Sequence, residues 1–211
     1  MRVVGECRGG RDSAVKDRWR WVDLEVRPGR KVAKSERAGR VYVDRARLMF
    51  ADIDALREWK HDDSIDGQAD MVFWGLDAEA AAKEAKAPRL PDSDDTAMYG
   101  WENIPDADAR RKGGLVWQAM QKNQWKVALD YRPHSHHWNV MRQVRASATE
   151  SGTIEVGGAT MCGFMTSWGD GLFYVVVECD KGGEVVRVRL QLGDDERVKF
   201  FYDVMKRARV R

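Results

Sequence analysis

Three of the chain's four histidines lie in one seven-residue stretch, RPHSHHW, at residues 132–138. If this stretch is extended, alternation places His134 and His136 on one face of a strand and His137 on the other. Asp130 lies four positions before His134 and shares its face. Two imidazoles and a carboxylate can bind a divalent metal such as zinc, whose bound water would be the nucleophile of a hydrolase. The alternative is a polar strand entry or binding surface that does no chemistry.

A second candidate is the turn formed by Gly169, Asp170 and Gly171. An aspartate between two glycines could bring its carboxylate close to a ligand. The same pattern is typical of a tight hairpin turn in which glycine supplies positive φ and aspartate bonds the backbone. The pattern alone favours the turn.

Other catalytic signatures are missing from the sequence. There is no GxSxG elbow, no phosphate-binding P-loop and no GxGxxG motif. The three cysteines, Cys7, Cys162 and Cys179, form no CxxC pair, which disfavours a disulfide framework and a thiolate zinc site. We therefore expect a protein without a catalytic centre and without a cofactor, with the metal-dependent hydrolase as the alternative.

The net charge of +2 conceals an uneven distribution of charge. Residues 48–109 hold 16 Asp and Glu against 5 Lys and Arg, a net charge of −11. The segments before and after are basic, with net charges of +7 (14 against 7) and +6 (17 against 11). The acidic middle either faces the basic flanks within the fold, is solvated, or attracts a basic protein partner. The candidate partner-binding residues, from segments 52–70 and 92–108, are Asp62, Asp63, Asp66, Asp94 and Asp95.

Aromatic and basic residues alternate at Arg18, Trp19, Arg20 and Trp21. This mixture is used by proteins that bind single-stranded nucleic acid, because bases stack on aromatic rings while cations contact phosphates. A strand that carries arginines on its wet face gives the same pattern. The sequence pI of about 8.4 is below the value of about 9 that marks a dedicated nucleic-acid binder, so this function is disfavoured.

The elements that must position these residues can be predicted from hydrophobic periodicity and turn residues. The first part contains strand-like runs, a short helix at residues 52–59 and a helix of strong helix formers over residues 76–87, with Asp77 placed to cap it. A further helix begins near Pro105, although Gly113 and Gly114 weaken it. The last third alternates between strand-like runs and turns, including HWNVMRQVRAS at residues 137–147. Residues 193–211 have the apolar spacing of an amphipathic helix.

These elements predict an α+β fold dominated by antiparallel sheet, arranged as a meander, a sandwich or a half-barrel with a few packed helices. We expect a single domain over residues 1–211. The proline- and aspartate-rich residues 87–98 are a possible sub-boundary between an N-terminal α/β part (1–86) and an antiparallel sheet with a C-terminal helix (99–211).

The segment SWGDGLFYVVVECDKGGEVVRVRLQL, residues 167–192, is similar to the C-terminal signature of the bacterial DUF4241 family, whose function is unknown. Gly39, Val41, Val43 and Asp44 match a weaker N-terminal pattern of that family. The resemblance covers about 40 of the 211 residues and implies a small, mainly β bacterial protein, with some members encoded near toxin or defence genes. It implies no catalytic residues.

The sequence therefore predicts a non-catalytic binding protein, of the immunity or accessory kind, that engages a basic partner through its acidic middle. Its first residues, MRVVGECRGGRD, lack the apolar stretch of a secretory signal, and no apolar run reaches the ~20 residues of a membrane span. We expect it in the cytoplasm, with no membrane partner.

Overall fold

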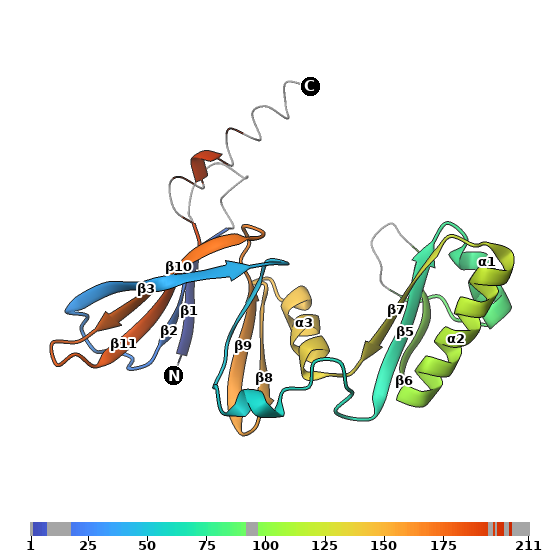
Figure 1. Cartoon of the computed structure of the whole chain (residues 1–211), viewed down its shortest axis with the longest axis horizontal. Coiled ribbons are helices and arrows are strands. Elements are labelled where there is room, and N and C mark those ends of the chain that lie inside the picture. Colours follow the sequence, from blue (N-terminus) through green and yellow to red (C-terminus); the bar gives the residue numbers. More distant parts are fainter. Residues whose placement is uncertain are drawn as a thin grey trace. The chain divides into compact units, whose positions relative to one another are not determined.

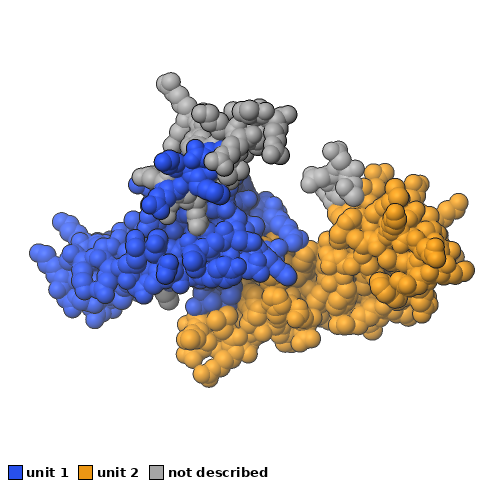
Figure 2. Space-filling view, turned by 45° about the horizontal axis from the view of Figure 1, so that its top comes forward, with its two compact units in different colours: residues 1–51, 144–153, 161–211 blue, residues 52–143, 154–160 orange. Residues whose placement is uncertain are grey.

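A computed structural model describes residues 2–7, 18–91 and 97–193, together with Glu196, residues 198–200 and Asp203. The chain divides into two compact units, which Figure 2 colours separately. Unit 1 comprises residues 1–51, 144–153 and 161–211, and unit 2 comprises residues 52–143 and 154–160. The described residues of the segment 87–98, where the sequence suggests a sub-boundary, belong to unit 2.

Unit 1 contains a five-stranded sheet of order β1-β2-β11-β10-β3, in which every neighbouring pair is antiparallel (Figure 1). The sheet combines three strands from the first part of the chain, β1, β2 and β3, with two from its last third, β10 and β11. The strands are β1 (Arg2–Cys7), β2 (Trp19–Glu25), β3 (Lys34–Val43), β10 (Gly171–Cys179) and β11 (Val185–Gln191).

The sequence VVRVRLQ of β11 alternates apolar and polar residues, which predicts one buried and one wet face, and the structure has both. Val186 and Leu190 are buried on one face of the sheet, and Leu190 joins a core with Val22 and Phe173. Arg187 and the other polar side chains of β11 lie on the opposite face, as the period of two requires.

The strands around β3 differ from the prediction. The sequence predicts one strand-like run from Val41 and a loop before it, whereas β3 begins at Lys34 and β4 (Arg47–Phe50) is a separate strand. The chain changes direction between them because Arg45 and Ala46 both have positive φ, 71° and 54°.

A second sheet has the order β4-β9-β8, with β8 at Ser151–Val156 and β9 at Ala159–Met165. Since β9 and β10 belong to different sheets, the last third of the chain is not a continuous meander. Antiparallel sheet nevertheless dominates the fold, and the predicted α+β class is confirmed.

Unit 2 contains a three-stranded antiparallel sheet of order β6-β5-β7, with α1 and α2 packed side by side on one face (Figure 1). The central strand is almost wholly buried, and its Phe73 contacts the helices in a hydrophobic core. The elements are β5 (Gln68–Gly75), β6 (Tyr99–Pro105), β7 (Val127–Pro133), α1 (Ala78–Ala85), α2 (Asp106–Asn123) and a short 3-10 helix, η1 (Ala55–Glu58).

The predicted helices of unit 2 are confirmed, and the two glycines of α2 differ in their surroundings. A Cβ atom on Gly113 would lie 2.4 Å from Met71 Cε, so glycine allows α2 to approach β5 closely. Gly114 has nothing within 4 Å. Asp77 precedes α1, but its side chain accepts the Lys126 N–H (2.7 Å) and does not cap the helix.

The prediction of a strand at residues 137–147 is wrong, because α3 occupies His136–Ala146. Ser135 precedes the helix, and its hydroxyl oxygen accepts the Trp138 N–H (3.1 Å), an N-cap that replaces a missing intrahelical partner. Val140, Met141 and Val144 are buried, at spacings that fit a helix and not a strand.

Most of the predicted C-terminal helix, residues 193–211, lies outside the described residues, although the described positions from Glu196 to Asp203 are helical. Within the described part of the chain, no helix is both long enough and apolar enough to span a membrane.

Candidate functional site

The histidine-rich stretch is the connection between a strand and a helix. Strand β7 ends at Pro133 and α3 begins at His136, so the stretch is not extended throughout. The strand alternation that would pair His134 with His136 therefore does not apply. Each of the three histidines instead contacts the segment formed by residues 59–66.

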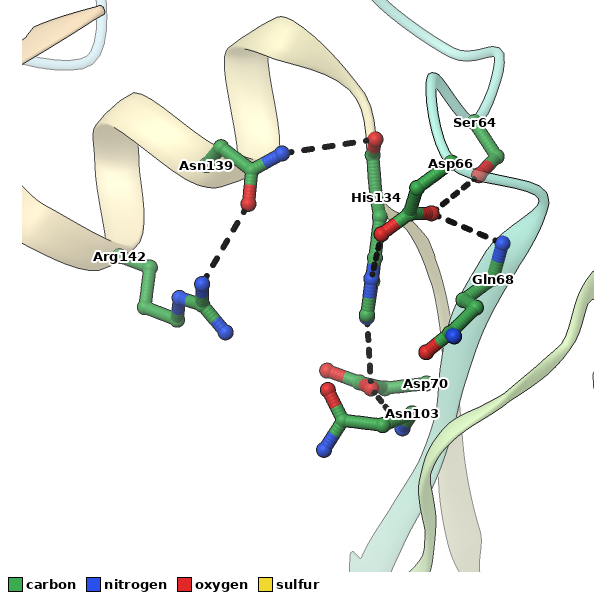
Figure 3. Close-up of polar contacts among 8 residues, drawn as sticks. All are labelled: Ser64, Asp66, Gln68, Asp70, Asn103, His134, Asn139 and Arg142. Atoms are coloured by element: carbon green, nitrogen blue, oxygen red, sulfur yellow. Dashed lines mark hydrogen bonds and ion pairs between the residues drawn. The ribbon is translucent and has the colours of Figure 1, made fainter.

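His134 lies between two aspartates (Figure 3). Its Nδ1 atom is 3.0 Å from Asp66 Oδ2, and its Nε2 atom is 3.1 Å from Asp70 Oδ1. An ionised carboxylate can only accept, so two ionised aspartates require both ring nitrogens to donate, which is the arrangement of an imidazolium cation. His134 and Asp70 are buried, with 4% and 5% of their surfaces exposed, and Asp70 also accepts the Asn103 N–H (2.8 Å).

The pKa values agree with this charge state. Burial alone would lower the pKa of His134, but the hydrogen bonds to Asp66 and Asp70 outweigh it, so the pKa lies above its ordinary value of 6.5. Burial would raise the pKa of Asp66, yet the hydrogen bonds from His134, the Gln68 N–H and the Ser64 hydroxyl hold it below the ordinary 3.8. Each group thus favours the charged form of its partner.

His136 is held in the opposite protonation state. Its Nδ1 atom accepts the Lys60 N–H (2.9 Å), and its own backbone N–H donates to the Lys60 carbonyl oxygen (3.1 Å). The ring stacks on Trp59 with centroids 5.6 Å apart. Burial, and then the charge of Lys60, lower the pKa of His136, which favours the neutral ring that can accept a hydrogen bond.

Two further contacts complete the attachment. The ring of His137 lies against the ring of His61, with centroids 4.2 Å apart. The carbonyl oxygen of His134 accepts the Ile65 N–H (3.0 Å) and, at 3.5 Å, the side-chain amide of Asn139 in α3 (Figure 3). Both main-chain and side-chain contacts therefore join the histidine stretch to residues 59–66.

We call residues 52–66 the acidic loop, because they hold six Asp and Glu against two Lys and Arg, a net charge of −4. The carboxylate of Asp52 accepts the N–H groups of Asp54 and Ala55 at the start of η1, at 2.9 and 3.0 Å. Asp62 and Asp63 are exposed at the surface of the loop. Exposed apolar side chains accompany them: Ile53, Leu56 and Ile65.

The predicted partner-binding aspartates thus have different positions. Asp62 and Asp63 are exposed, whereas the Asp66 carboxylate is bonded within the molecule to His134. Asp94 and Asp95 lie outside the described residues.

The structure does not bring together the three residues of the predicted metal site. His134 bonds Asp66 and Asp70, His136 bonds Lys60, and Asp130 Oδ2 accepts Arg132 Nε at 2.6 Å. Among the described residues, no group of three or more His, Cys, Asp or Glu is arranged to hold a metal ion.

The Gly-Asp-Gly turn has a structural contact within unit 1. Gly169 and Gly171 have φ angles of 79° and 152°, the positive values that the sequence predicts. Asp170 Oδ1 accepts the Ala46 N–H (2.6 Å), as expected of an aspartate that bonds the backbone. The turn joins β9 to β10, which lie in different sheets, so it is not the tip of a hairpin.

The aromatic and basic residues at the start of β2 do not form one surface. The pairing of β1 with β2 shifts between Glu6 and Cys7, and this bulge places Trp19 and Trp21 on opposite faces. Trp19 packs against Gly5 and the hydrophobic core. Trp21 lies beneath Arg189, whose Cζ atom is 4.4 Å from the centroid of the Trp21 ring.

The two arginines beside these tryptophans have separate partners too. Arg18 lies 5.4 Å over the ring of Trp168, and Arg20 is 3.6 Å from Glu6. A strip of stacked bases would therefore not meet both tryptophans at once, and the geometry gives no support to the nucleic-acid alternative.

Sequence reasoning missed Asp70 and His61, which complete the histidine contacts. A signal for Asp70 was present, since it is the one charged residue in the apolar run ADMVFWG at residues 69–75 and a buried charge needs a partner. Nothing comparable marks His61, whose role depends on a contact with residue 137 that only the fold creates.

No protein-family model, curated protein or solved structure significantly matches the chain. The resemblance to the DUF4241 family therefore stays a prediction.

Proposed function

We propose that this protein is a non-catalytic binding protein that presents its acidic loop to a basic protein partner, as an immunity or accessory protein would. The observation that carries the proposal is the attachment of the loop to the histidine stretch, with the exposed carboxylates of Asp62 and Asp63 between its fixed points at Lys60 and Ile65.

Such an attachment favours binding because a loop that is already ordered loses less conformational entropy when a partner docks. The loop combines acidic residues with exposed apolar ones, Ile53 at 80% and Ile65 at 43%. Carboxylates would steer a basic partner to the loop, and apolar side chains would bury surface once it has arrived.

The same contacts argue against a catalytic role for His134. A general base or metal ligand needs a ring nitrogen with a free lone pair, and both nitrogens of His134 are bonded to carboxylates. His134 is also buried, so a substrate would have to displace Asp66 or Asp70 to reach it.

The proposal is tested by capture of partners with matched charge variants. The Asp62→Asn, Asp63→Asn double variant removes two negative charges from the acidic loop. The Glu79→Gln, Glu102→Gln double variant removes two charges from exposed positions elsewhere in unit 2 and serves as the control.

We expect the loop variant to lose a partner that the control retains, and moderate salt to weaken the native complex because exposed charges are screened over about 8 Å at physiological ionic strength. If the loop variant retained every partner of the native protein, the proposal would be abandoned. Capture that did not respond to salt would also contradict it.

A further inference from the structure

The polar face of the five-stranded sheet in unit 1 contains a buried network of charges. Asp23, with 1% of its surface exposed, accepts two hydrogen bonds from Arg189, at 2.8 and 2.9 Å. Arg187 bridges Asp23 (3.1 Å) and Glu178 (2.5 Å). Two arginines and two carboxylates thus balance one another across β2, β11 and β10, where Arg189 is opposite Asp23 and Arg187 is opposite Glu178.

This network fixes the orientation of side chains that line a hollow of about 500 Å³. The volume lies within the roughly 300–1,000 Å³ that is common for small-molecule sites. The lining residues come from all five strands of the sheet, and the ones that carry the chemistry are Glu6, Arg20, Trp21, Glu178, Arg189 and Gln191.

Several polar groups of the hollow have bonding capacity left. The bonds from Arg189 to Asp23 use two of its three guanidinium nitrogens, and those from Arg187 use one oxygen of Glu178. The side chains of Arg20 and Glu6 are 57% and 50% exposed and lie 3.6 Å apart, so they form a weak ion pair. Within the described part of the chain, no hydrogen bond engages the side-chain amide of Gln191.

Across the hollow, two negatively charged side chains flank two positively charged ones. Glu6 lies on the outer strand β1, Arg20 and Arg189 lie on β2 and β11, and Glu178 lies on β10. The carboxylate group of a bound ligand would contact the two arginines in the middle, and its ammonium group would contact a glutamate beside them. The polar lining disfavours an apolar ligand, and the glutamates would repel a polyphosphate.

We infer that this hollow binds a zwitterionic small molecule of the size of an amino acid or a dipeptide, with its carboxylate at Arg20 and Arg189 and its ammonium group at Glu178. The site lies wholly within unit 1 and does not depend on the proposed role of the acidic loop.

The test is a titration of the full chain with four probes, in which binding is monitored by calorimetry and by the NMR signal of the Trp21 indole N–H. Glycylglycine carries both charges, acetate carries only the negative one, ethylammonium carries only the positive one, and glucose carries none. The Arg20→Gln variant removes an exposed cation of the hollow, and the Arg40→Gln variant removes an exposed cation of β3 that does not line it.

We expect saturable binding of glycylglycine, with a shift of the Trp21 signal and weaker binding of the other three probes. Loss of a charge-assisted hydrogen bond should weaken binding about tenfold or more in Arg20→Gln and leave Arg40→Gln at the native affinity. The inference would be overturned by absence of saturable glycylglycine binding, by equal binding of acetate, ethylammonium or glucose, or by equal affinities of the two variants.

Discussion

Replacement of His134 by alanine should destabilise unit 2 through the aspartate that it leaves behind. Removing one partner of a buried ion pair costs about 3–5 kcal/mol, because the remaining charge is desolvated without compensation. Asp70 is that remaining charge, with a side chain only 7% exposed, but it keeps the hydrogen bond from the Asn103 N–H. The cost should therefore lie near the lower limit, at about 3 kcal/mol.

The second partner of His134 contributes much less. The Asp66 side chain is 48% exposed, and a pair of this kind is worth roughly 0–1 kcal/mol. The Asp66→Asn variant should thus lose less than about 1 kcal/mol. In the double variant His134→Leu, Asp70→Leu no buried charge is left unpaired, so most of the loss of stability should be recovered.

The assay is the free energy of unfolding of the full chain in urea at neutral pH, together with hydrogen exchange at the amides of Ile65 and Asn103, which report on unit 2 directly. If His134→Ala cost no more than Asp66→Asn, or if the double leucine variant were less stable than His134→Ala, the assignment of His134 as the cation of a buried ion pair would be refuted.

The remaining predictions concern pH, backbone geometry and the charge network of unit 1. The raised pKa of His134 gives stability that is present below pH 6.5 and is lost as pH rises through the folded pKa. The lowered pKa of His136 gives stability that is present above pH 6.5 and is lost as pH falls through the folded pKa. NMR titration of the two rings should show one pKa above 6.5 and the other below it. Gly114→Ala should stabilise α2 by up to about 1 kcal/mol in urea unfolding, because nothing lies near its Cβ position. Gly100→Ala should destabilise unit 2 by more than about 2 kcal/mol in the same measurement, since its Cβ atom would lie 2.0 Å from the Met71 carbonyl oxygen at a φ of 152°. Asp23→Ala should lower the thermal midpoint of unit 1 and cost about 3 kcal/mol, because Arg187 and Arg189 lose their shared carboxylate.

Local patterns in the sequence predicted much of the fold. The period of two in β11 and the helix formers of α1 correspond to elements that the structure contains. These patterns succeed where one face of an element is buried and the other is wet, because burial then imposes the period on the sequence.

The failures arise where a single residue outweighs the pattern. Ser135 caps a helix whose first five residues, from His136 to Val140, are weak helix formers, and the sequence therefore predicts a strand there. The bulge opposite Glu6 and Cys7 separates Trp19 from Trp21, which simple alternation places on one face. Caps and bulges depend on one or two residues and are therefore weak signals in a periodicity.

The candidate site was predicted in its parts and not in its assembly. The sequence marked the histidines and the acidic residues as separate features, one for chemistry and one for binding. Their connection depends on contacts between residues far apart in sequence, such as His134 with Asp66 and His136 with Lys60. Sequence spacing holds no information on such contacts, so the sequence alone pairs His134 and His136 with the nearby Asp130.

The protonation state of His134 tests the central claim most directly, because it decides whether the histidines fix the acidic loop or serve a reaction. The measurement is the ¹⁵N chemical shifts of the His134 ring at pH 6.5, the ordinary histidine pKa, with and without added zinc. We predict two protonated ring nitrogens whose shifts zinc leaves unchanged, because both are bonded to carboxylates. A neutral ring with one bare nitrogen that responds to zinc would contradict this account and favour the metal-dependent hydrolase.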